Sequence, residues 1–217
     1  MSARGRFITL EGPEGSGKTT AARHLATWLR ERGVSTVLTH EPGGTPLGEE
    51  VRRIVLHMRG MSDDLDPRAD ALLYAAARAQ HVARVIRPAL ERGEWVVCAR
   101  FGDSSLAYQG AGYGNDPEEM RRLQSFATDG LRPDLTILLD VPVDVGLDRT
   151  RRRNEWNRFE DTEQVDFFER VRAAYLRMAE DEPERFRIVD GAGSVADSDE
   201  RIRAVVAEAL SLPLSDH

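Results

Sequence analysis

The chain has 217 residues, of which 41% are hydrophobic and 31% are charged, as is typical of a globular protein. Its length suits one α/β domain, so we expect a single domain over residues 1–217. The formal net charge of −7 argues against a general nucleic-acid-binding protein, which would neutralise phosphates with surplus basic residues. There is no apolar run of membrane-spanning length, no signal-peptide pattern, and Cys98 is the single cysteine. We therefore expect a cytoplasmic protein without nucleic-acid or membrane partners.

Short apolar runs alternate with helical patterns along the chain. The runs are rich in β-branched residues and predict buried parallel strands. They are Phe7–Leu10, Val34–Thr39, Trp95–Ala99, Leu135–Asp140 and Phe186–Asp190. Helices are predicted over Lys18–Arg32, Leu47–His57, Pro67–Arg92, Pro117–Ala127, Val143–Thr150, Asp166–Glu182 and Asp199–Leu210. We expect a kink at Pro88 and a capping pair of Asp197 with Glu200. The alternation predicts an α/β fold, a five-stranded parallel sheet with helices on both faces.

The stretch after the first strand, GPEGSGKT (residues 12–19), matches the P-loop pattern of Gly, four residues, Gly-Lys and Ser or Thr. Glycines allow the backbone N–H groups to face a polyphosphate, and the following helix presents its positive end. Lys18, the one lysine of the chain, can reach the β- and γ-phosphates, and the Thr19 hydroxyl can bind Mg²⁺. The pattern predicts a nucleoside triphosphate site. The expected ATP-binding residues are Gly12, Pro13, Glu14, Gly15, Ser16, Gly17, Lys18, Thr19 and Thr20.

Two further polar loops follow the second and third predicted strands. They are residues 40–45, HEPGGT, and residues 100–105, RFGDSS. Because the carboxyl ends of parallel strands meet at one edge of the sheet, we expect a second ligand pocket beside the triphosphate. A switch GTPase would need an Asn-Lys-x-Asp guanine motif, which the single lysine excludes. A phosphotransferase that acts on a small acceptor is the better interpretation.

Several segments, in order and over most of the chain, resemble thymidylate kinases, the P-loop enzymes that phosphorylate dTMP to dTDP. They are FITLEGPEGSGKTT (7–20), EPGGTPLGEEVR (41–52), ALLYAAARAQH (71–81), SSLAYQG (104–110), RPDLTILLDVPVDVGLDR (132–149) and RFEDTEQVDFFERVRAAY (158–175). The resemblance implies a three-layer P-loop nucleoside monophosphate kinase fold with a short Arg-rich lid at about residues 149–162. It also implies ATP and Mg²⁺ as cofactors, dTMP as the acceptor and a homodimer.

The resemblance also implies roles for acceptor-site residues. Tyr74 would stack on thymine and Arg78, one helical turn later, would donate to the base carbonyl O4. Ser105 would bind the base with help from Gln109, and Tyr108 would favour deoxyribose. The alternatives are a core aromatic at Tyr74, a surface cation at Arg78 and plain packing of Tyr108. The full acceptor-binding set that the resemblance implies is Glu41, Arg52, Tyr74, Arg78, Arg100, Ser105, Tyr108 and Gln109.

Catalysis by such an enzyme needs cations on the transferring phosphoryl group. The P-loop carries no arginine, so the resemblance is to the bacterial subtype, which supplies arginine from the lid. The implied catalytic residues are Lys18, Arg100, Arg153, Arg158 and Glu14, with Thr19 and Glu14 near Mg²⁺. Arg52 and Arg100 would hold the acceptor phosphate.

The sequence departs from the family pattern at Ala99, where an Asp is usual, and at His40, where Arg is common. The missing Asp leaves its role near the acceptor phosphate and metal to Glu14, to Asp103, to water or to no group at all. Three interpretations therefore remain: a thymidylate kinase, a kinase for another nucleotide or deoxynucleoside, and a nucleotide-binding protein that has lost catalysis. Turnover with a panel of acceptors would discriminate them.

Overall fold

The computed structural model describes residues 4–58, 65–152 and 165–211, and it contains a five-stranded parallel sheet. The strand order is β2-β3-β1-β4-β5, and every neighbouring pair is parallel. The strands are β1 (Phe7–Glu11), β2 (Thr36–His40), β3 (Trp95–Ala99), β4 (Leu135–Asp140) and β5 (Phe186–Asp190). The predicted sheet is confirmed. The strand that we expected from Val34 begins at Thr36, because the Val34 N–H donates to the Leu29 carbonyl at 3.0 Å and continues the preceding helix end.

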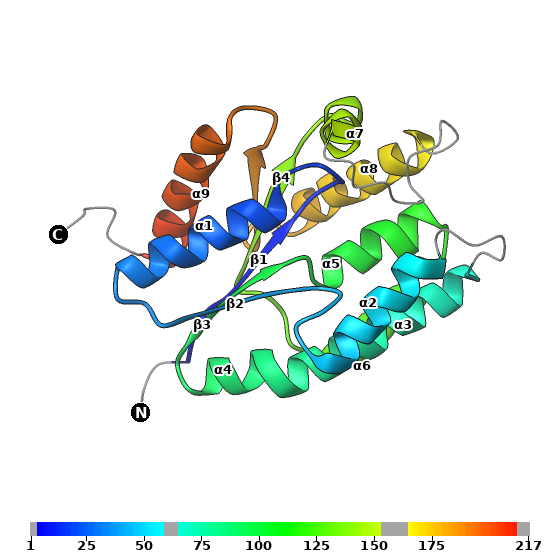
Figure 1. Cartoon of the computed structure of the whole chain (residues 1–217), viewed down its shortest axis with the longest axis horizontal. Coiled ribbons are helices and arrows are strands. Elements are labelled where there is room, and N and C mark those ends of the chain that lie inside the picture. The colour runs from blue at the N-terminus through cyan, green and yellow to red at the C-terminus, as the bar shows by residue number, and fades with distance from the viewer. Residues whose placement is uncertain (1–3, 59–64, 153–164, 212–217) are drawn as a thin grey trace.

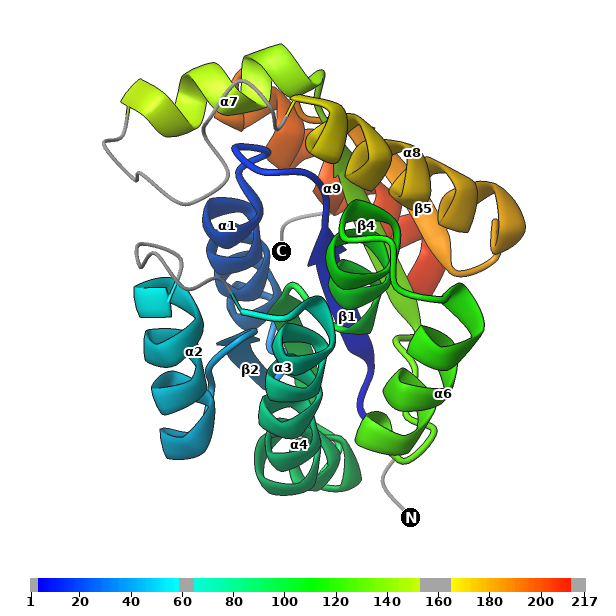
Figure 2. The same cartoon turned by 90° about the vertical axis from the view of Figure 1, so that its right-hand side faces the viewer.

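Helices cover both faces of the sheet (Figures 1 and 2). One face carries α1 (Lys18–Glu31) and α9 (Val195–Leu210), which pack on each other and on the strands. The other face carries α3 (Pro67–His81), α4 (Arg87–Glu91), α5 (Gly102–Ser105), α6 (Pro117–Thr128) and α8 (Val165–Asp181). Helix α2 (Pro46–Met58) packs on α3, and α7 (Val143–Arg152) lies beyond the carboxyl end of β4. No helix among the described residues is long and apolar enough to cross a membrane.

The central strand β1 is buried along its whole length, which fixes the position of the P-loop that follows it. Ile8 and Leu10 face α1 and α9, where they pack with Leu25, Ile137 and other apolar side chains. Phe7, on the opposite face, packs edge-on against Phe101 with a ring distance of 4.9 Å. Full burial of such a side chain stabilises the fold by roughly 1.5–3 kcal/mol.

The long helix predicted from Pro67 to Arg92 is interrupted. Helix α3 ends at His81, a π-helical turn η1 spans Val82–Ile86, and α4 starts at Arg87. Pro88, in the first turn of α4, has no N–H to donate to the preceding turn, and the wider π-helical turn accommodates it.

Two other boundaries differ from expectation. Helix α9 starts at Val195, and its capping box joins Ser194 to Asp197, so the predicted pair of Asp197 with Glu200 was wrong by one turn. Residues 100–105, which we expected as a loop after β3, instead form helix α5 from Gly102 onward, and a π-helical segment η2 (Leu106–Gly112) follows. Segment η2 is helical because its apolar side chains, including Ala107, pack on α8.

Candidate active site

The P-loop connects β1 to α1 in the geometry that an anion site needs. Gly15 has φ +71°, and a Cβ there would lie 2.0 Å from the Gly146 carbonyl oxygen, so the turn requires glycine. Among the described residues, no side chain caps α1 at Gly17 and no acidic residue occupies its first turn. The N-terminal N–H groups and the positive end of the helix dipole therefore remain available to a phosphate.

Lys18 reaches back into this loop. Its ammonium group donates to the Pro13 carbonyl at 2.7 Å and to the Ser16 hydroxyl at 3.0 Å, and the residue is 6% exposed. Thr19, the next residue, is exposed in the first turn of α1. Mg²⁺ in nucleotide sites usually takes one or two protein oxygens together with water and phosphate oxygens. Thr19 suits that role, and the described residues contain no cluster of three or more acidic, His or Cys side chains that could form a protein cage.

Three predicted site residues meet beside the P-loop. Nη2 of Arg100 donates to Oε2 of Glu14 at 2.6 Å and to the Tyr108 hydroxyl at 3.3 Å. The Arg100 guanidinium also lies over the Tyr108 ring at 4.9 Å. Because burial raises the pKa of Tyr108, its hydroxyl is protonated at neutral pH. The pair with Glu14 therefore places the Arg100 guanidinium beside the P-loop, and the predicted position of Glu14 near Mg²⁺ stays a prediction.

The backbone of Arg100 has φ +67°, a left-handed conformation that a residue with a Cβ adopts at a cost of about 1–2 kcal/mol. This conformation occurs directly after β3, where the chain turns towards the P-loop. Strain of this kind is often kept at functional sites. The strained turn therefore supports a functional role for the Arg100 guanidinium.

A second group of predicted residues forms a buried network between α3 and the loop after β2. Arg78 is 1% exposed, and its Nε donates to Oε2 of Glu41 at 2.7 Å. Its Nη1 donates to the Ser105 hydroxyl at 3.1 Å and to Oε1 of Gln124, and its Nη2 to the Phe101 carbonyl at 3.1 Å. The alternative of a surface cation at Arg78 is thus wrong. Its predicted contact with a base carbonyl stays a prediction.

His81 extends this network. Its Nδ1 lies 2.9 Å from Oε1 of Glu41 and its Nε2 lies 2.7 Å from the Thr39 hydroxyl, with the ring fully buried. Both carboxylate oxygens of Glu41 are therefore engaged by α3. The Glu41 carboxylate therefore fixes the orientation of the Arg78 guanidinium. The EPGGT motif alone did not reveal this role.

The remaining acceptor residues lie around these two groups. Tyr74 is half-buried and packs against Val51 and Val55 of α2. Gln109 is 2% exposed and its Nε2 donates to Oδ2 of Asp70 at 2.9 Å. Arg52 makes a long contact of 3.4 Å from its Nη1 to the Pro42 carbonyl.

Glu11 is a buried acid that the sequence patterns did not single out. It accepts hydrogen bonds from the Phe101 N–H at 2.7 Å and from the hydroxyls of Ser104 and Tyr175 at 2.6 and 3.0 Å. Burial, reinforced by the nearby Asp103 carboxylate, raises the pKa of Glu11 above its ordinary value. Glu11 thereby ties β1 to the segment that carries Arg100. A charged residue inside an apolar strand was the available sequence signal.

The structure shows what surrounds Ala99 and His40, the two residues that depart from the family pattern. Ala99 is 4% exposed within the apolar cluster under α1, so the chain has an apolar contact where the resemblance implied a carboxylate. Asp103, which we considered as a replacement acid, is bound to Arg185 at 2.6 Å and 2.9 Å. Its role as a substitute for the missing acid stays a prediction. Partial burial lowers the pKa of His40, so this ring is neutral near pH 7 and does not replace an arginine charge.

The predicted lid falls only partly within the described structure. Arg153 and Arg158 lie outside the described residues. Arg149, in α7, donates from both terminal nitrogens to the Gly191 and Ala192 carbonyls at 2.7 Å, so it anchors the loop after β5. The loop after β5 therefore lies close to the P-loop edge, and a Cβ on Gly191 would approach the Ser16 carbonyl at 3.5 Å.

Comparisons with known proteins agree with this geometry. A family model described as thymidylate kinase matches residues 10–202. A thymidylate kinase of Pseudomonas syringae pv. tomato is 49% identical over 210 residues, which cover 96% of this chain and 98% of that protein. Thymidylate kinases of Pseudomonas putida and Desulfovibrio desulfuricans are each 52% identical over 191 residues, covering 88% and 85% of this chain and 90% and 87% of those proteins.

Proposed function

The chain belongs to the thymidylate kinase family, and on this basis we propose that it transfers the γ-phosphoryl group of ATP to dTMP. The observation that carries the proposal is the contact of Glu14, in the P-loop, with Arg100 and Tyr108, from the adjoining loop and η2. A triphosphate site and an acceptor site that share residues can hold two phosphates close enough for direct transfer.

The transfer needs little covalent participation by the protein. A phosphate oxygen of dTMP forms the new bond to the γ-phosphorus, the bond from that phosphorus to the β-bridging oxygen breaks, and ADP leaves. The acceptor phosphate is already largely ionised near pH 7, so a strong general base is not required. Lys18 would exchange its contacts with Pro13 and Ser16 for phosphate oxygens, while Arg100 would hold the attacking phosphate.

Mg²⁺ belongs to the same proposal. When bound, it would neutralise charge on the phosphate oxygens. Thr19 would supply the protein oxygen, and the absence of an acid at Ala99 leaves water to fill other positions. The lid arginines Arg153 and Arg158 would supply further positive charge on closure.

The acceptor base would lie between Tyr74 and the side chains of Arg78, Ser105 and Gln109. The hydrogen bonds that Arg78 donates to four protein groups fix the plane of its guanidinium. The folded protein already holds the Arg78 guanidinium in one orientation, so binding a base does not cost further side-chain entropy. A donor held in this way favours bases that place a carbonyl oxygen opposite it.

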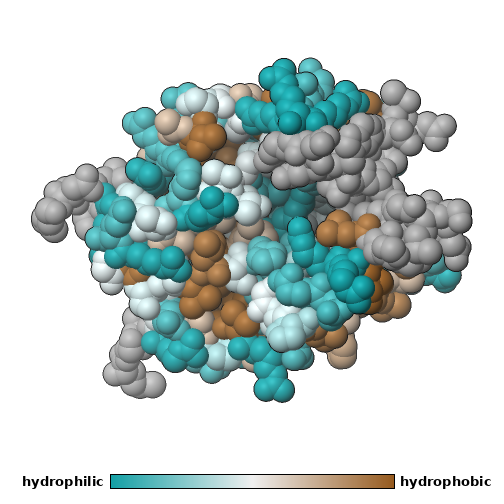
Figure 3. Space-filling view, viewed as in Figure 1, coloured by the Kyte–Doolittle hydropathy of each residue, from teal (hydrophilic) through white to brown (hydrophobic). Residues whose placement is uncertain are grey.

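We also propose a cytoplasmic homodimer. Five exposed apolar side chains lie on the adjacent helices α2, α3 and α6, namely Leu47, Ile54, Leu56, Leu72 and Phe126. Phe126 is 86% exposed and Leu72 is 59% exposed. Apolar surface is visible over α2 and α3 at the right of Figure 3. Exposed apolar side chains gathered on adjacent helices are typical of an interface, and symmetric dimers are the commonest assemblies.

The deciding experiment measures ADP release with ATP and Mg²⁺, comparing dTMP with dUMP, dCMP, AMP, UMP and thymidine. We expect dTMP to give the highest kcat/KM. Preference for another acceptor would keep the reaction class and contradict the roles of Tyr74, Arg78 and Ser105. Binding of ATP and dTMP without turnover would identify a nucleotide-binding protein that has lost catalysis, for which Ala99→Asp is the rescue to measure.

A further inference from the structure

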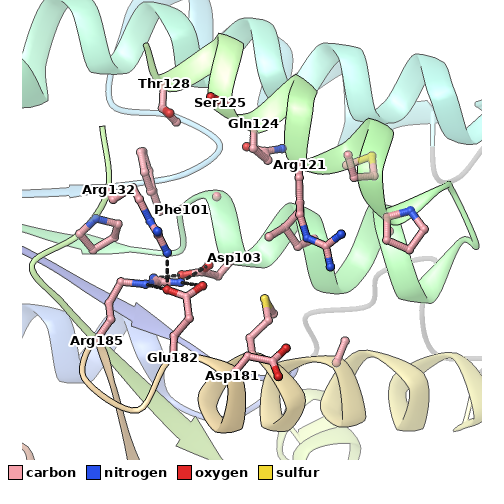
Figure 4. Close-up of a pocket in the computed structure, with 18 of the residues that line it drawn as sticks. Phe101, Asp103, Arg121, Gln124, Ser125, Thr128, Arg132, Asp181, Glu182 and Arg185 are labelled. Atoms are coloured by element: carbon pink, nitrogen blue, oxygen red, sulfur yellow. Dashed lines mark hydrogen bonds and ion pairs between the residues drawn. The ribbon is translucent and has the colours of Figure 1, made fainter. Parts of the chain in front are cut away.

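A cavity of about 640 Å³ lies between α6 and α8, with α5 and η2 along its wall (Figure 4). None of the predicted ATP- or acceptor-binding residues lines it. Its volume falls within the roughly 300–1,000 Å³ of small-molecule sites. It therefore lies outside the predicted nucleotide-binding residues and is large enough for a small ligand.

The cavity combines apolar walls with a polar floor that is formed by ion pairs. Apolar lining comes from Phe101, Leu106, Met120, Leu131 and Met178. On the floor, Arg185 is held by Asp103 and Glu182, with side-chain exposures of 11% for Arg185 and 8% for Asp103. Arg132 also pairs with Glu182. These four charged groups balance one another, so the floor is ordered and electrically neutral.

The rim supplies an excess of positive charge. Arg121 projects from α6 towards the cavity (Figure 4), and its contact with Glu118 is a long one of 3.7 Å. Arg177, from α8, has no ion pair among the described residues. Asp181 is the one rim carboxylate of the described lining. The described lining thus carries four arginines and three carboxylates in a chain of net charge −7.

We propose that this cavity binds a small organic monoanion with an apolar body, and that its occupancy changes the affinity for the acceptor. The apolar walls would remove the body of the ligand from water. A guanidinium of Arg121 or Arg177 would pair with its carboxylate, sulfonate or phosphate group at the rim.

The coupling follows from two residues that the cavity shares with the Arg78 network, and this part rests on the proposed function. Gln124 and Phe101 both line the cavity. Oε1 of Gln124 and the Phe101 carbonyl both accept hydrogen bonds from Arg78, whose guanidinium lies 5.4 Å from the centre of the Phe101 ring. A ligand that shifts either residue changes the orientation of Arg78, and the linkage is reciprocal.

The first test fills the cavity covalently. Ser125, an exposed cavity residue on α6, is changed to Cys and labelled with benzyl methanethiosulfonate; Cys98, at 0% exposure, is protected. We expect the label to raise the KM for dTMP by about fivefold or more and to change the KM for ATP less than twofold. Ser35→Cys with the same label is the matched control, because Ser35 is exposed between α1 and β2 and lies outside the cavity lining. Equal KM values for dTMP in labelled and unlabelled Ser125→Cys would overturn the coupling. Failure of the unmodified chain to phosphorylate dTMP would instead count against the proposed function.

The second test addresses the ligand class directly, without turnover. The probe is 8-anilinonaphthalene-1-sulfonate, an aromatic monoanion, titrated by fluorescence with both nucleotide sites saturated by ADP and dTMP. Its concentration range is extended by about tenfold, because the reciprocal linkage makes bound dTMP weaken the binding of the probe. We expect the benzyl label on the Ser125→Cys protein to abolish one binding site and Arg121→Ala to weaken that site by about two- to fivefold. Arg122→Ala, on the same helix but outside the lining, is the control. An unchanged titration after labelling would overturn the proposed site.

Discussion

Arg78 links the fold to the proposed acceptor site through a fully buried ion pair. The side-chain exposures of Arg78 and Glu41 are 1% and 3%. Removal of one partner leaves the other charge buried without compensation, which typically costs about 3–5 kcal/mol. Arg78 is therefore a structural residue as well as a candidate for base recognition.

We predict that Arg78→Ala lowers the free energy of unfolding by about 3–5 kcal/mol and raises the KM for dTMP more than the KM for ATP. Urea unfolding and steady-state kinetics measure the two effects. Arg78→Ala combined with Glu41→Gln is the control, because it removes the stranded carboxylate and should recover part of the stability. Equal increases in both KM values would contradict a role at the acceptor base.

The sequence predicted the residues whose role follows from a contiguous motif. It missed the residues whose role depends on partners that lie far away in the sequence. The P-loop pattern identified Lys18 from eight consecutive residues. Gln124, in contrast, meets Arg78 across 46 positions, and Glu11 meets Ser104 across 93. No local pattern marks either residue, because their roles come from the packing of α6 and β1 against other elements. Pairing with Glu41, similarly, could not be read from the EPGGT motif.

At the scale of elements, the three central strands β1, β3 and β4 were predictable because burial on both faces demands continuous apolar runs. The boundaries of the helices were less predictable from the sequence. The change from α3 to η1 depends on how Pro88 is accommodated, and η2 depends on contact with α8. Both are tertiary effects that periodicity does not encode.

The contact between α7 and the P-loop gives a prediction about elements. A Cβ on Gly146 would lie 2.3 Å from the Glu14 carbonyl oxygen, so Gly146→Ala must push α7 away from the loop. We expect a net loss of about 1–3 kcal/mol of stability, despite the better helix propensity of Ala, and a raised KM for ATP. Thermal unfolding and kinetics test this.

Gly110→Ala is the matched stability control. It is also helical, and its added Cβ would meet no atom outside its own helix closer than 3.8 Å. A Gly146→Ala protein as stable as the unmodified chain, with an unchanged KM for ATP, would show that α7 does not constrain the loop.

The buried junction at Glu11 predicts a pH dependence. Because burial raises the pKa of Glu11 in the folded protein, the folded state binds the proton more tightly than the unfolded state. The stability that Glu11 contributes is therefore fully present below its unfolded pKa and is lost as the pH rises through the folded pKa. Glu11→Gln, a near-isosteric neutral change, removes this titration.

We expect the stability of Glu11→Gln relative to the unmodified chain to increase from about pH 5 to about pH 8, by about 1.4 kcal/mol for each unit by which the pKa is raised. Urea unfolding at several pH values measures the difference. A difference that stays constant, or that changes in the opposite direction, would contradict a raised pKa at Glu11.

At the scale of the whole molecule, the exposed apolar side chains are unevenly distributed. Five of the nine large ones among the described residues lie on α2, α3 and α6. The proposed acceptor site would lie against the same helices, since α3 carries Tyr74 and Arg78. Association through this surface would therefore support the helix that positions both residues.

We predict that Phe126→Glu converts the proposed dimer to a monomer, because it places two charges in the apolar surface that two copies would bury. A stable interface buries roughly 800 Å² per partner, and a desolvated unpaired carboxylate at its centre is strongly unfavourable. Sedimentation velocity measures the change. Val195→Glu, at an exposed apolar position on α9, is the matched control and should leave the assembly intact.

Phe126 is 86% exposed, so its replacement should not alter the fold of the monomer. A monomeric unmodified chain would exclude the dimer, and a dimer that persists in Phe126→Glu would place its interface elsewhere. If dissociation also raises the KM for dTMP, then the assembly stabilises α3 in its binding conformation.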